Sequence, residues 1–210
     1  MKQEAVQSLV QNTRMSLNIY KFPNLAINLG WIGGCNFALE KMEDCDYVVL
    51  VNDDILMPAV CDWCENMVNV MEDNLTIGAV GPVTNNAMGW SRIAPFNCTL
   101  KRPIEVPYLA FFMVMLRTEA IRKVGLLDKD LPGGDDLDYC LRLRENGYKI
   151  AITPNVFVWH YYAQTGKKLY GNYWDSEEHT EKINNALIRK HGFKKYINSK
   201  YVMEGSHTKN

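Results

Sequence analysis

The sequence feature that most constrains the fold is an alternation of continuous apolar runs with segments of helical period. The runs DYVVLV (46–51) and IGAVGPV (77–83) are typical of strands that other elements cover on both faces. Apolar residues recur at helical spacing at 59–72, at 118–124 and at 136–146. Alternation of this kind predicts an α/β fold whose mostly parallel sheet is flanked by helices.

Weaker patterns extend this order toward both ends of the chain. Residues 2–14 and 31–42 have helical period, and LNIYKF (17–22) alternates as a half-buried strand does. Two short strands are expected before His160, and residues 175–192 have the pattern of an amphipathic helix.

Length and composition fit one globular domain, or one domain with a short appendage. The chain has 210 residues, of which 47% are hydrophobic and 22% charged, and these values exclude a disordered chain. Its 23 basic and 24 acidic residues give a net charge of -1, so no electrostatic attraction to nucleic acids or acidic membranes is expected. No apolar run reaches the length of a membrane-spanning helix.

The six cysteines are dispersed and do not form a disulfide framework. Cys61 and Cys64 make a lone CxxC pair, with no second pair and no nearby histidine to complete a zinc site. Their spacing makes them neighbours on a helix. The sequence therefore predicts reduced thiols and a cytoplasmic location.

Polar residues follow the run DYVVLV at the point where the strand ends. Asn52 and Asp54 share one face of the strand, while Asp53 points to the other. Ligands bind beyond the carboxyl ends of strands in open α/β sheets, and a hard divalent cation prefers oxygen ligands. Asp54 is the best single candidate for a metal ligand. Taken alone, however, these three residues are more often a solvated turn or a helix cap.

A second acidic cluster lies where a helix is expected to begin. Asp135 and Asp136 follow Gly133 and Gly134, which allow the backbone to approach a ligand closely. A carboxylate at this place suits either a general base or a helix cap, and the residues alone favour neither. His160 ends an apolar strand, where a lone histidine is more often capped or solvated than a ligand.

Six segments occur together in one order and resemble successive blocks of the family 2 glycosyltransferases, most closely the rhamnosyltransferase-like branch. The resemblance extends from residue 24 to about residue 166, and it implies the GT-A (Rossmann-like) fold. The segments are NLGWIGGCNFAL (28–39), DYVVLVNDDILM (46–57), IGAVGPV (77–83), RTEAIRKVGLLD (117–128), GGDDLDYCLRLRENGYKI (133–150) and VFVWHYYAQTG (156–166).

The resemblance also implies roles for single residues. Asp54 matches the second carboxylate of the family's metal-binding motif, and His160 matches a histidine that completes the metal site in relatives. Asp136 matches the catalytic base, with Asp135 beside it in place of the usual glutamate. Asn52 replaces the first carboxylate of the metal motif. The donor-binding residues are expected among Gly33, Gly34, Asn36, Asn52, Asp53 and Gly134.

Together these roles imply an inverting glycosyltransferase that depends on Mn²⁺ or Mg²⁺. Its substrates are a nucleotide-sugar donor and the hydroxyl group of a glycan or another acceptor. We expect a core over residues 1–166 and a C-terminal helical extension over 167–210 that packs on it. Relatives normally begin with a strand, a helix and a second strand that hold the nucleotide base, and no segment here resembles them. The resemblance therefore implies a shortened nucleotide-binding half.

The shortened nucleotide-binding half and Asn52 also allow two other hypotheses about function. The chain would then be a non-catalytic module that binds a glycan or a nucleotide, or a fold fragment that needs a partner chain. Trp31, Trp90 and Trp159 suit a sugar-binding cleft, although packing alone accounts for each of them. The loop 84–105 contains no readable chemistry.

Overall fold

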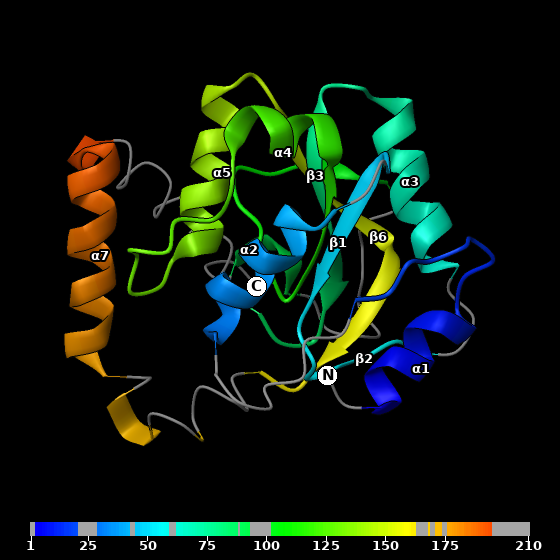
Figure 1. Ribbon diagram of the computed structural model, residues 1–210, viewed down its shortest axis with the longest axis horizontal. Helices are drawn as coiled ribbons and strands as arrows, with labels where there is room; N and C mark the ends of the chain where they lie inside the picture. Colours follow the sequence, from blue (N-terminus) through cyan, green and yellow to red (C-terminus); the bar gives the residue numbers. More distant parts are fainter. Residues whose placement is uncertain are drawn as a thin grey trace.

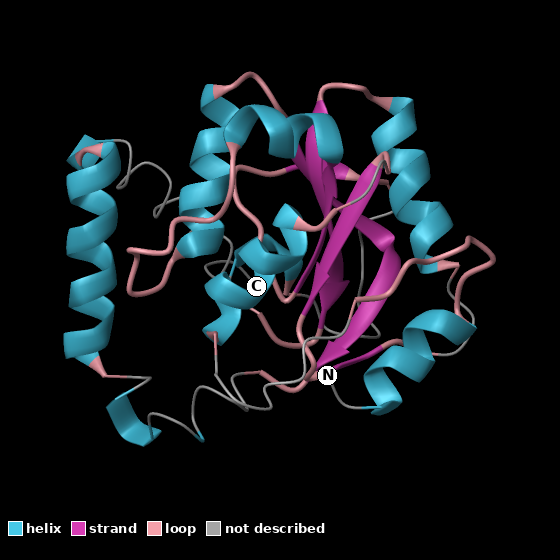
Figure 2. Cartoon of the chain, in the orientation of Figure 1, coloured by secondary structure: helices cyan, strands magenta, loops and turns pink. Residues whose placement is uncertain are grey.

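A central sheet lies between two sets of helices in the computed structural model of the chain (Figure 1; Figure 2). The strand order is β1-β5-β3-β6-β2, and β4 pairs with β6. The strands are β1 (Tyr47–Val51), β2 (Ile55–Leu56), β3 (Ile77–Thr84), β4 (Ile104–Glu105), β5 (Met113–Arg117) and β6 (Lys149–His160). The structure describes residues 3–20, 29–42, 45–58, 62–87, 89–92, 102–162, 168, 171–173 and 176–194.

The sheet is mixed. β3 and β6 pair in parallel, whereas β5 pairs antiparallel with both β1 and β3. β1, β3 and β6 therefore point the same way, and β5 runs back between β1 and β3. β2 and β4 also pair antiparallel with β6. The predicted α/β fold with flanking helices is confirmed, but the expectation of a mostly parallel sheet is wrong, because an apolar run that is buried on both faces does not reveal its direction.

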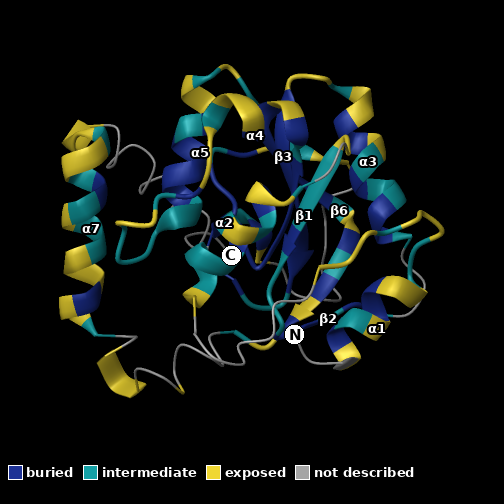
Figure 3. Ribbon diagram, viewed as in Figure 1, coloured by how far each residue is buried: buried dark blue, intermediate teal, exposed yellow. Residues whose placement is uncertain are grey.

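One apolar core lies on each face of the sheet, between the strands and the helices. Successive side chains of a strand point to opposite faces, so neighbouring strand residues belong to different cores. On β5, Val114 and Leu116 face the first core, while Met113 and Met115 face the second. Buried strand residues separate the helices in Figure 3. The first core contains side chains of α2 (Gly30–Glu40), α4 (Thr118–Val124), α5 (Asp135–Glu145) and α7 (Glu177–His191), and the second those of α1 (Gln3–Gln11) and α3 (Trp63–Asp73).

β6 is one long strand where two short strands were expected. Its pairing with β3 shifts between Thr153 and Phe157, so a bulge separates two regular halves. Pro154 lies in this bulge, as expected of a residue that has no N–H to donate to the ladder. The predicted strand at 17–22 is wrong for residues 17–20, which form no strand, and its last two residues lie outside the described part of the chain.

α7 packs on the start of α5. Leu187 belongs to the first core and is 2% exposed, and Ile183 packs beside it. At the C-terminal end of α7, His191 Nε2 lies 2.8 Å and Lys190 Nζ 2.7 Å from the same carboxylate oxygen of Asp138. Asp138 is fully buried, so this ion-pair cluster fixes α7 against α5.

Of the helices that the structure describes, none combines the length and the hydropathy that a bilayer crossing requires. Two short 3-10 helices complete the described elements, at Gly89–Ser91 and Gly171–Tyr173.

Candidate active site

Strand pairing brings Asp54 and His160 together. Asp54 follows β1 and immediately precedes β2, and Ile55 of β2 pairs with His160, the last residue of β6. His160 Nε2 lies 3.3 Å from Asp54 Oδ1, and each side chain is less than a tenth exposed. The backbone closes the same junction, because Tyr161 N–H donates to Asp54 O at 2.9 Å. The two residues that the resemblance implies as metal ligands are therefore neighbours.

The contacts of His160 decide which ring nitrogen carries its hydrogen. Nδ1 lies 2.7 Å from the carbonyl oxygen of Asn86, which can only accept, so Nδ1 is the donor. In the neutral ring the lone pair is then on Nε2, which faces Asp54. The ring stacks on Phe112 with centroids 4.9 Å apart, and the His160 N–H donates to Asn85 Oδ1 at 2.8 Å. Both sides of the imidazole are thus held in place.

This geometry fits a divalent cation. His160 Nε2 is buried, and no hydrogen bond reaches it from the described residues. A buried lone pair 3.3 Å from a carboxylate oxygen suits a divalent cation, which Asp54 and His160 would hold together. Within the described segments, no third His, Cys, Asp or Glu side chain joins them in a metal-binding group. Two protein ligands leave positions for water and phosphate oxygens, which is the usual arrangement for Mg²⁺ and similar ions.

Asn52 and Asp53 lie in the bend between β1 and β2. Asn52 N–H donates to Phe112 O at 2.9 Å, which extends the β1–β5 ladder by one bond. The Asn52 and Asp53 side chains are both half-buried. Their backbone position beside Asp54 is as predicted, and their role in donor binding stays a prediction.

The second acidic pair lies at the start of α5. Gly134 precedes the helix with φ 71°, a left-handed conformation that glycine adopts readily. Trp31 Nε1 donates to Asp135 Oδ2 at 2.9 Å, and the Tyr108 hydroxyl donates to Asp136 Oδ2 at 2.6 Å. The carboxyls are partners of two aromatic side chains, from α2 and from the segment before β5. Asp136 Oδ1 also accepts from Leu137 N–H at 2.8 Å, so this carboxyl satisfies one of the free N–H groups in the first turn of its own helix as well.

Burial raises the pKa of both carboxyls. For Asp135, desolvation and the charge of Asp136 raise the pKa from 3.8 to about 7. For Asp136, desolvation raises the pKa, while hydrogen bonds from Tyr108, Leu137 N–H and Phe111 N–H oppose the rise. Burial and the Asp136 carboxylate raise the pKa of Tyr108 well above its ordinary value, so its hydroxyl remains a donor. At neutral pH the pair is therefore partly protonated.

One short segment contacts both clusters. Tyr108 and the Phe111 N–H bind Asp136, and one residue further on the Phe112 ring stacks on His160. The Phe112 carbonyl also accepts the Asn52 N–H. The segment 108–112 therefore fixes the base candidate and the metal candidate relative to each other.

Two of the predicted donor-binding residues, Asn36 and Gly134, have structural contacts of their own. The side-chain amide of Asn36 donates to Leu127 O at 2.8 Å and accepts from Leu127 N–H at 2.9 Å, so Asn36 anchors the turn after α4, and its role in donor binding stays a prediction. A Cβ on Gly133 or Gly134 would lie 2.8 Å or 2.9 Å from side chains of α7. Close packing against α7 therefore requires glycine at both positions, and the role of Gly134 in donor binding stays a prediction.

Gly33 and Gly34 lie inside α2, where helix propensity disfavours glycine. A Cβ on Gly33 would lie 3.1 Å from Leu29 Cβ, whereas one on Gly34 would meet no atom within 4 Å. No described contact accounts for Gly34, and it remains the better donor-binding candidate of the two.

Sequence reasoning missed the partners that hold the site. Tyr108 begins the apolar run 108–116, and a buried tyrosine in such a run usually needs a hydrogen-bond partner for its hydroxyl. Asn86 lies in the loop that contained no readable chemistry, and it acts through its backbone, which no side-chain pattern reveals. The sequence allows packing or a sugar-binding cleft for Trp31, and it does not reveal that the indole N–H donates to Asp135.

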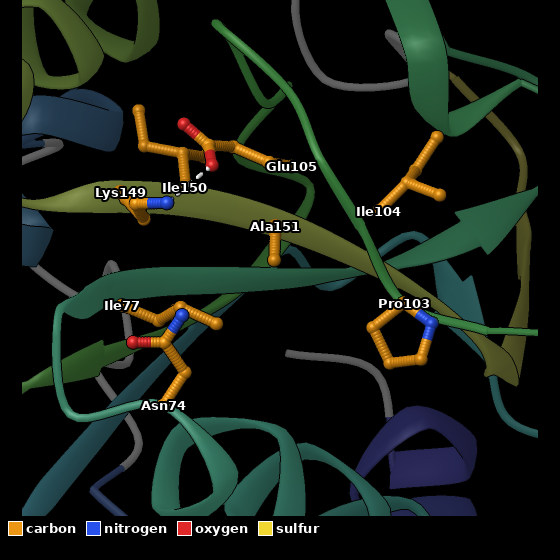
Figure 4. A pocket seen from close by; sticks show the side chains of 8 residues that line it. All are labelled: Asn74, Ile77, Pro103, Ile104, Glu105, Lys149, Ile150 and Ala151. Carbon is orange, nitrogen blue, oxygen red and sulfur yellow. Dashed lines mark ion pairs between the residues drawn. The ribbon is translucent and has the colours of Figure 1, made fainter.

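Two surface cavities lie away from these residues. One of about 140 Å³ is lined by residues of β4 and β6 and by the turn after α3, and the Lys149–Glu105 ion pair of 2.9 Å crosses its rim (Figure 4). The other, of about 350 Å³, lies at the start of β1 and includes Tyr47 and Arg117. All three nitrogens of the Arg117 guanidinium already donate to protein oxygens. Neither cavity contains a residue of the two acidic clusters.

Comparison with known proteins identifies the fold. No protein-family model and no curated protein sequence matches the chain. The mannosyltransferase PcManGT from Pyrobaculum calidifontis, solved with GDP-Man and Mn²⁺, superposes with a TM-score of 0.56 at 20% identity over 82% of this chain. GalNAc-T7, solved with UDP, GalNAc and Mn²⁺, superposes with a TM-score of 0.52 at 18% identity over 62%. The fold is therefore that of the GT-A glycosyltransferases, and the chain spans 49% and 30% of these two proteins.

Proposed function

We propose that this chain is an inverting, metal-dependent glycosyltransferase of the family 2 type, which moves a sugar from a nucleotide-sugar donor to an acceptor hydroxyl. One observation carries the proposal. The segment 108–112 joins the possible metal site, Asp54 with His160, to the half-buried carboxyl pair at the start of α5. The two solved proteins compared above, PcManGT and GalNAc-T7, are glycosyltransferases whose structures contain Mn²⁺ and a nucleotide ligand, which supports the proposal.

Asp54 and His160 would hold Mn²⁺ or Mg²⁺. An imidazole ligand favours binding of Mn²⁺ over Mg²⁺. The bound metal ion would offset the negative charge that develops on the departing diphosphate. Asn52 contributes a neutral oxygen where relatives have a carboxylate, so the protein supplies less negative charge here. The donor's own phosphate oxygens would then complete the coordination.

Asp136 would be the base. It takes the proton of the acceptor hydroxyl while that oxygen attacks the anomeric carbon, and the bond from this carbon to the diphosphate oxygen breaks on the opposite face. A single displacement inverts the anomeric configuration. Retention through a covalent intermediate would need a separate nucleophile.

Nucleotide binding tests the metal site without knowledge of the sugar or the acceptor. We expect UDP, GDP or dTDP to bind in a calorimetric titration with Mn²⁺ and to bind at least tenfold more weakly without it. The variant Asp54→Ala should lose the effect of Mn²⁺. Asp73→Ala, which removes an exposed carboxylate at the end of α3, is the matched control and should bind as the wild type does. Failure of all three nucleotides to bind in the presence of Mn²⁺ would contradict the proposal.

Asn52 supports a second candidate, a binding module without turnover on the same fold. Donor screening separates the two, because the enzyme forms a glycosylated product and the Asp136→Asn variant does not, whereas the module retains the donor intact. Free thiols at Cys35, Cys45, Cys64 and Cys140 fit the proposed cytoplasmic location.

A further inference from the structure

The two adjacent carboxyls at the start of α5 have unequal sets of hydrogen-bond donors. Asp136 accepts from the Tyr108 hydroxyl at 2.6 Å, from Leu137 N–H at 2.8 Å and from Phe111 N–H. Asp135 accepts from the indole N–H of Trp31 at 2.9 Å. Hydrogen bonds that are donated to a carboxylate stabilise its ionised form. The short bond from Tyr108 is the largest difference between the two sites.

We infer, on the basis of the proposed function, that Tyr108 is a positioning residue, which holds Asp136 ionised and leaves the proton shared by the two carboxyls on Asp135. Tyr108 is 5% exposed, and its ring is wedged beside Gly89, where an added Cβ would lie 3.2 Å from the ring. The hydroxyl therefore has little freedom to leave Asp136.

The charged surroundings agree with one shared proton. Cys35 of α2 and Cys140 of α5 are buried thiols whose pKa burial raises, so neither supplies a negative charge near neutrality. Asp138, one turn along α5, adds a negative charge that raises the pKa of Asp135. The cations of α7 and α5 that face this side, Lys190, His191 and Arg142, all contact Asp138.

This arrangement suits a site that receives a diphosphate. Two ionised carboxylates would repel the donor as well as each other, whereas one protonated and one ionised carboxyl present a single charge. Tyr108 then assigns the ionised state to the carboxyl that serves as base. A proton on Asp135 also leaves Oδ2 able to accept from Trp31.

Carbon-13 NMR of protein labelled at the aspartate carboxyl carbon tests the assignment without any substrate. In the wild type we expect one of the pair to titrate near neutrality and the other at lower pH. The spectra of Asp135→Asn and Asp136→Asn assign the two signals. Tyr108→Phe should raise the midpoint of Asp136 by about one pH unit, because a hydrogen bond to the ionised form is lost. An unchanged midpoint, or a signal near neutrality that belongs to Asp136, would overturn the inference.

Tyr139→Phe is the matched control. Tyr139 is a fully buried tyrosine of α5, the helix that contains Asp135 and Asp136. Its hydroxyl donates to Gly125 O at 3.0 Å and not to either carboxyl. This variant should leave both midpoints within a few tenths of a pH unit of the wild type. A shift as large as that of Tyr108→Phe would show that lost packing, not the hydrogen bond, moves the titration, and it would also overturn the inference.

Kinetics separate this inference from the proposed function. In an active enzyme, the acidic limb of the kcat/KM profile should move to higher pH in Tyr108→Phe by the same amount as the NMR midpoint. A wild type that transfers sugar from no donor contradicts the proposed function, while the NMR titration still decides how the proton is shared.

Discussion

Asp135 and Asp136 are the same residue type at adjacent positions, and their surroundings give them different chemistry. Desolvation and the negative charge of Asp136 raise the pKa of Asp135 to about 7, although Trp31 donates a hydrogen bond to it. At Asp136, hydrogen bonds from Tyr108 and from backbone N–H groups oppose the rise that desolvation causes. The folded protein therefore binds a proton at Asp135 over a pH range in which the unfolded chain has released it. This difference links folding stability to pH.

The variant Asp135→Asn should be more stable than the wild type at pH 8. Because the pKa of Asp135 is higher in the folded state than its ordinary value of 3.8, the free energy of unfolding falls as pH rises from about 4 to about 7. Asparagine removes this dependence, so the gain should be on the order of 2–4 kcal/mol at pH 8 and near zero at pH 4. Urea unfolding across this range measures it.

The exposed Asp130 provides the control, because Asp130→Asn removes a carboxylate from the turn before α5 without entering the site. It should change the stability by less than about 0.5 kcal/mol at either pH. If the free energy of unfolding of Asp135→Asn changed with pH as much as that of the wild type does, the result would contradict the raised pKa of Asp135.

α7 is the element that holds the base-bearing end of α5 in place. Ile183 and Leu187 pack on the two glycines that precede Asp135, and the Asp138 cluster fixes the other end of the contact. The need for glycine at these two positions therefore comes from contacts with α7, which lies about fifty residues further along the chain. The division into a core over residues 1–166 and a C-terminal extension over 167–210 stays a prediction.

Gly134→Ala should destabilise the protein by about 1–3 kcal/mol for two reasons. Its φ of 71° is costly for alanine, and the new Cβ would lie 2.9 Å from Leu187 Cδ1. Gly147→Ala is the matched control at the other end of α5, with φ 84° and no atom within 4 Å of the new Cβ. The excess loss at Gly134, measured by urea unfolding, reports the α7 contact. Equal losses at the two positions would show that backbone strain alone matters.

The two cores share one sheet, so the whole molecule should unfold as one unit. Leu143 of the first core and Met67 of the second are both fully buried. Replacing either by alanine should lower the free energy of unfolding by about 2–5 kcal/mol. The far-ultraviolet circular dichroism and tryptophan fluorescence transitions should stay coincident in both variants.

Leu75→Ala serves as the reference, because Leu75 is 67% exposed and its loss should cost less than about 0.5 kcal/mol. Two separated transitions in either core variant would show instead that the helical layers unfold independently.

Local patterns predicted most elements, and long-range contacts account for what they missed. The strands at 46–51 and 77–83 and the helix that ends at Gly125 agree with the structure, because burial and capping leave marks in adjacent residues. The direction of β5 leaves no such mark. The contacts of Tyr108 with Asp136 and of Gly134 with α7 join residues far apart in sequence, and no periodicity encodes them.

The segment 108–112 has a consequence for how this chain tolerates change. Its two ends meet different partners, Asp136 at Tyr108 and His160 at Phe112, so its length in residues sets the spacing between them. Exchanging Ala110 for another small residue leaves that spacing intact. Inserting or deleting one residue anywhere between the ends shifts one contact out of register whatever the inserted side chain is. Among relatives that share this site, substitutions should therefore be common in the segment and changes of its length rare.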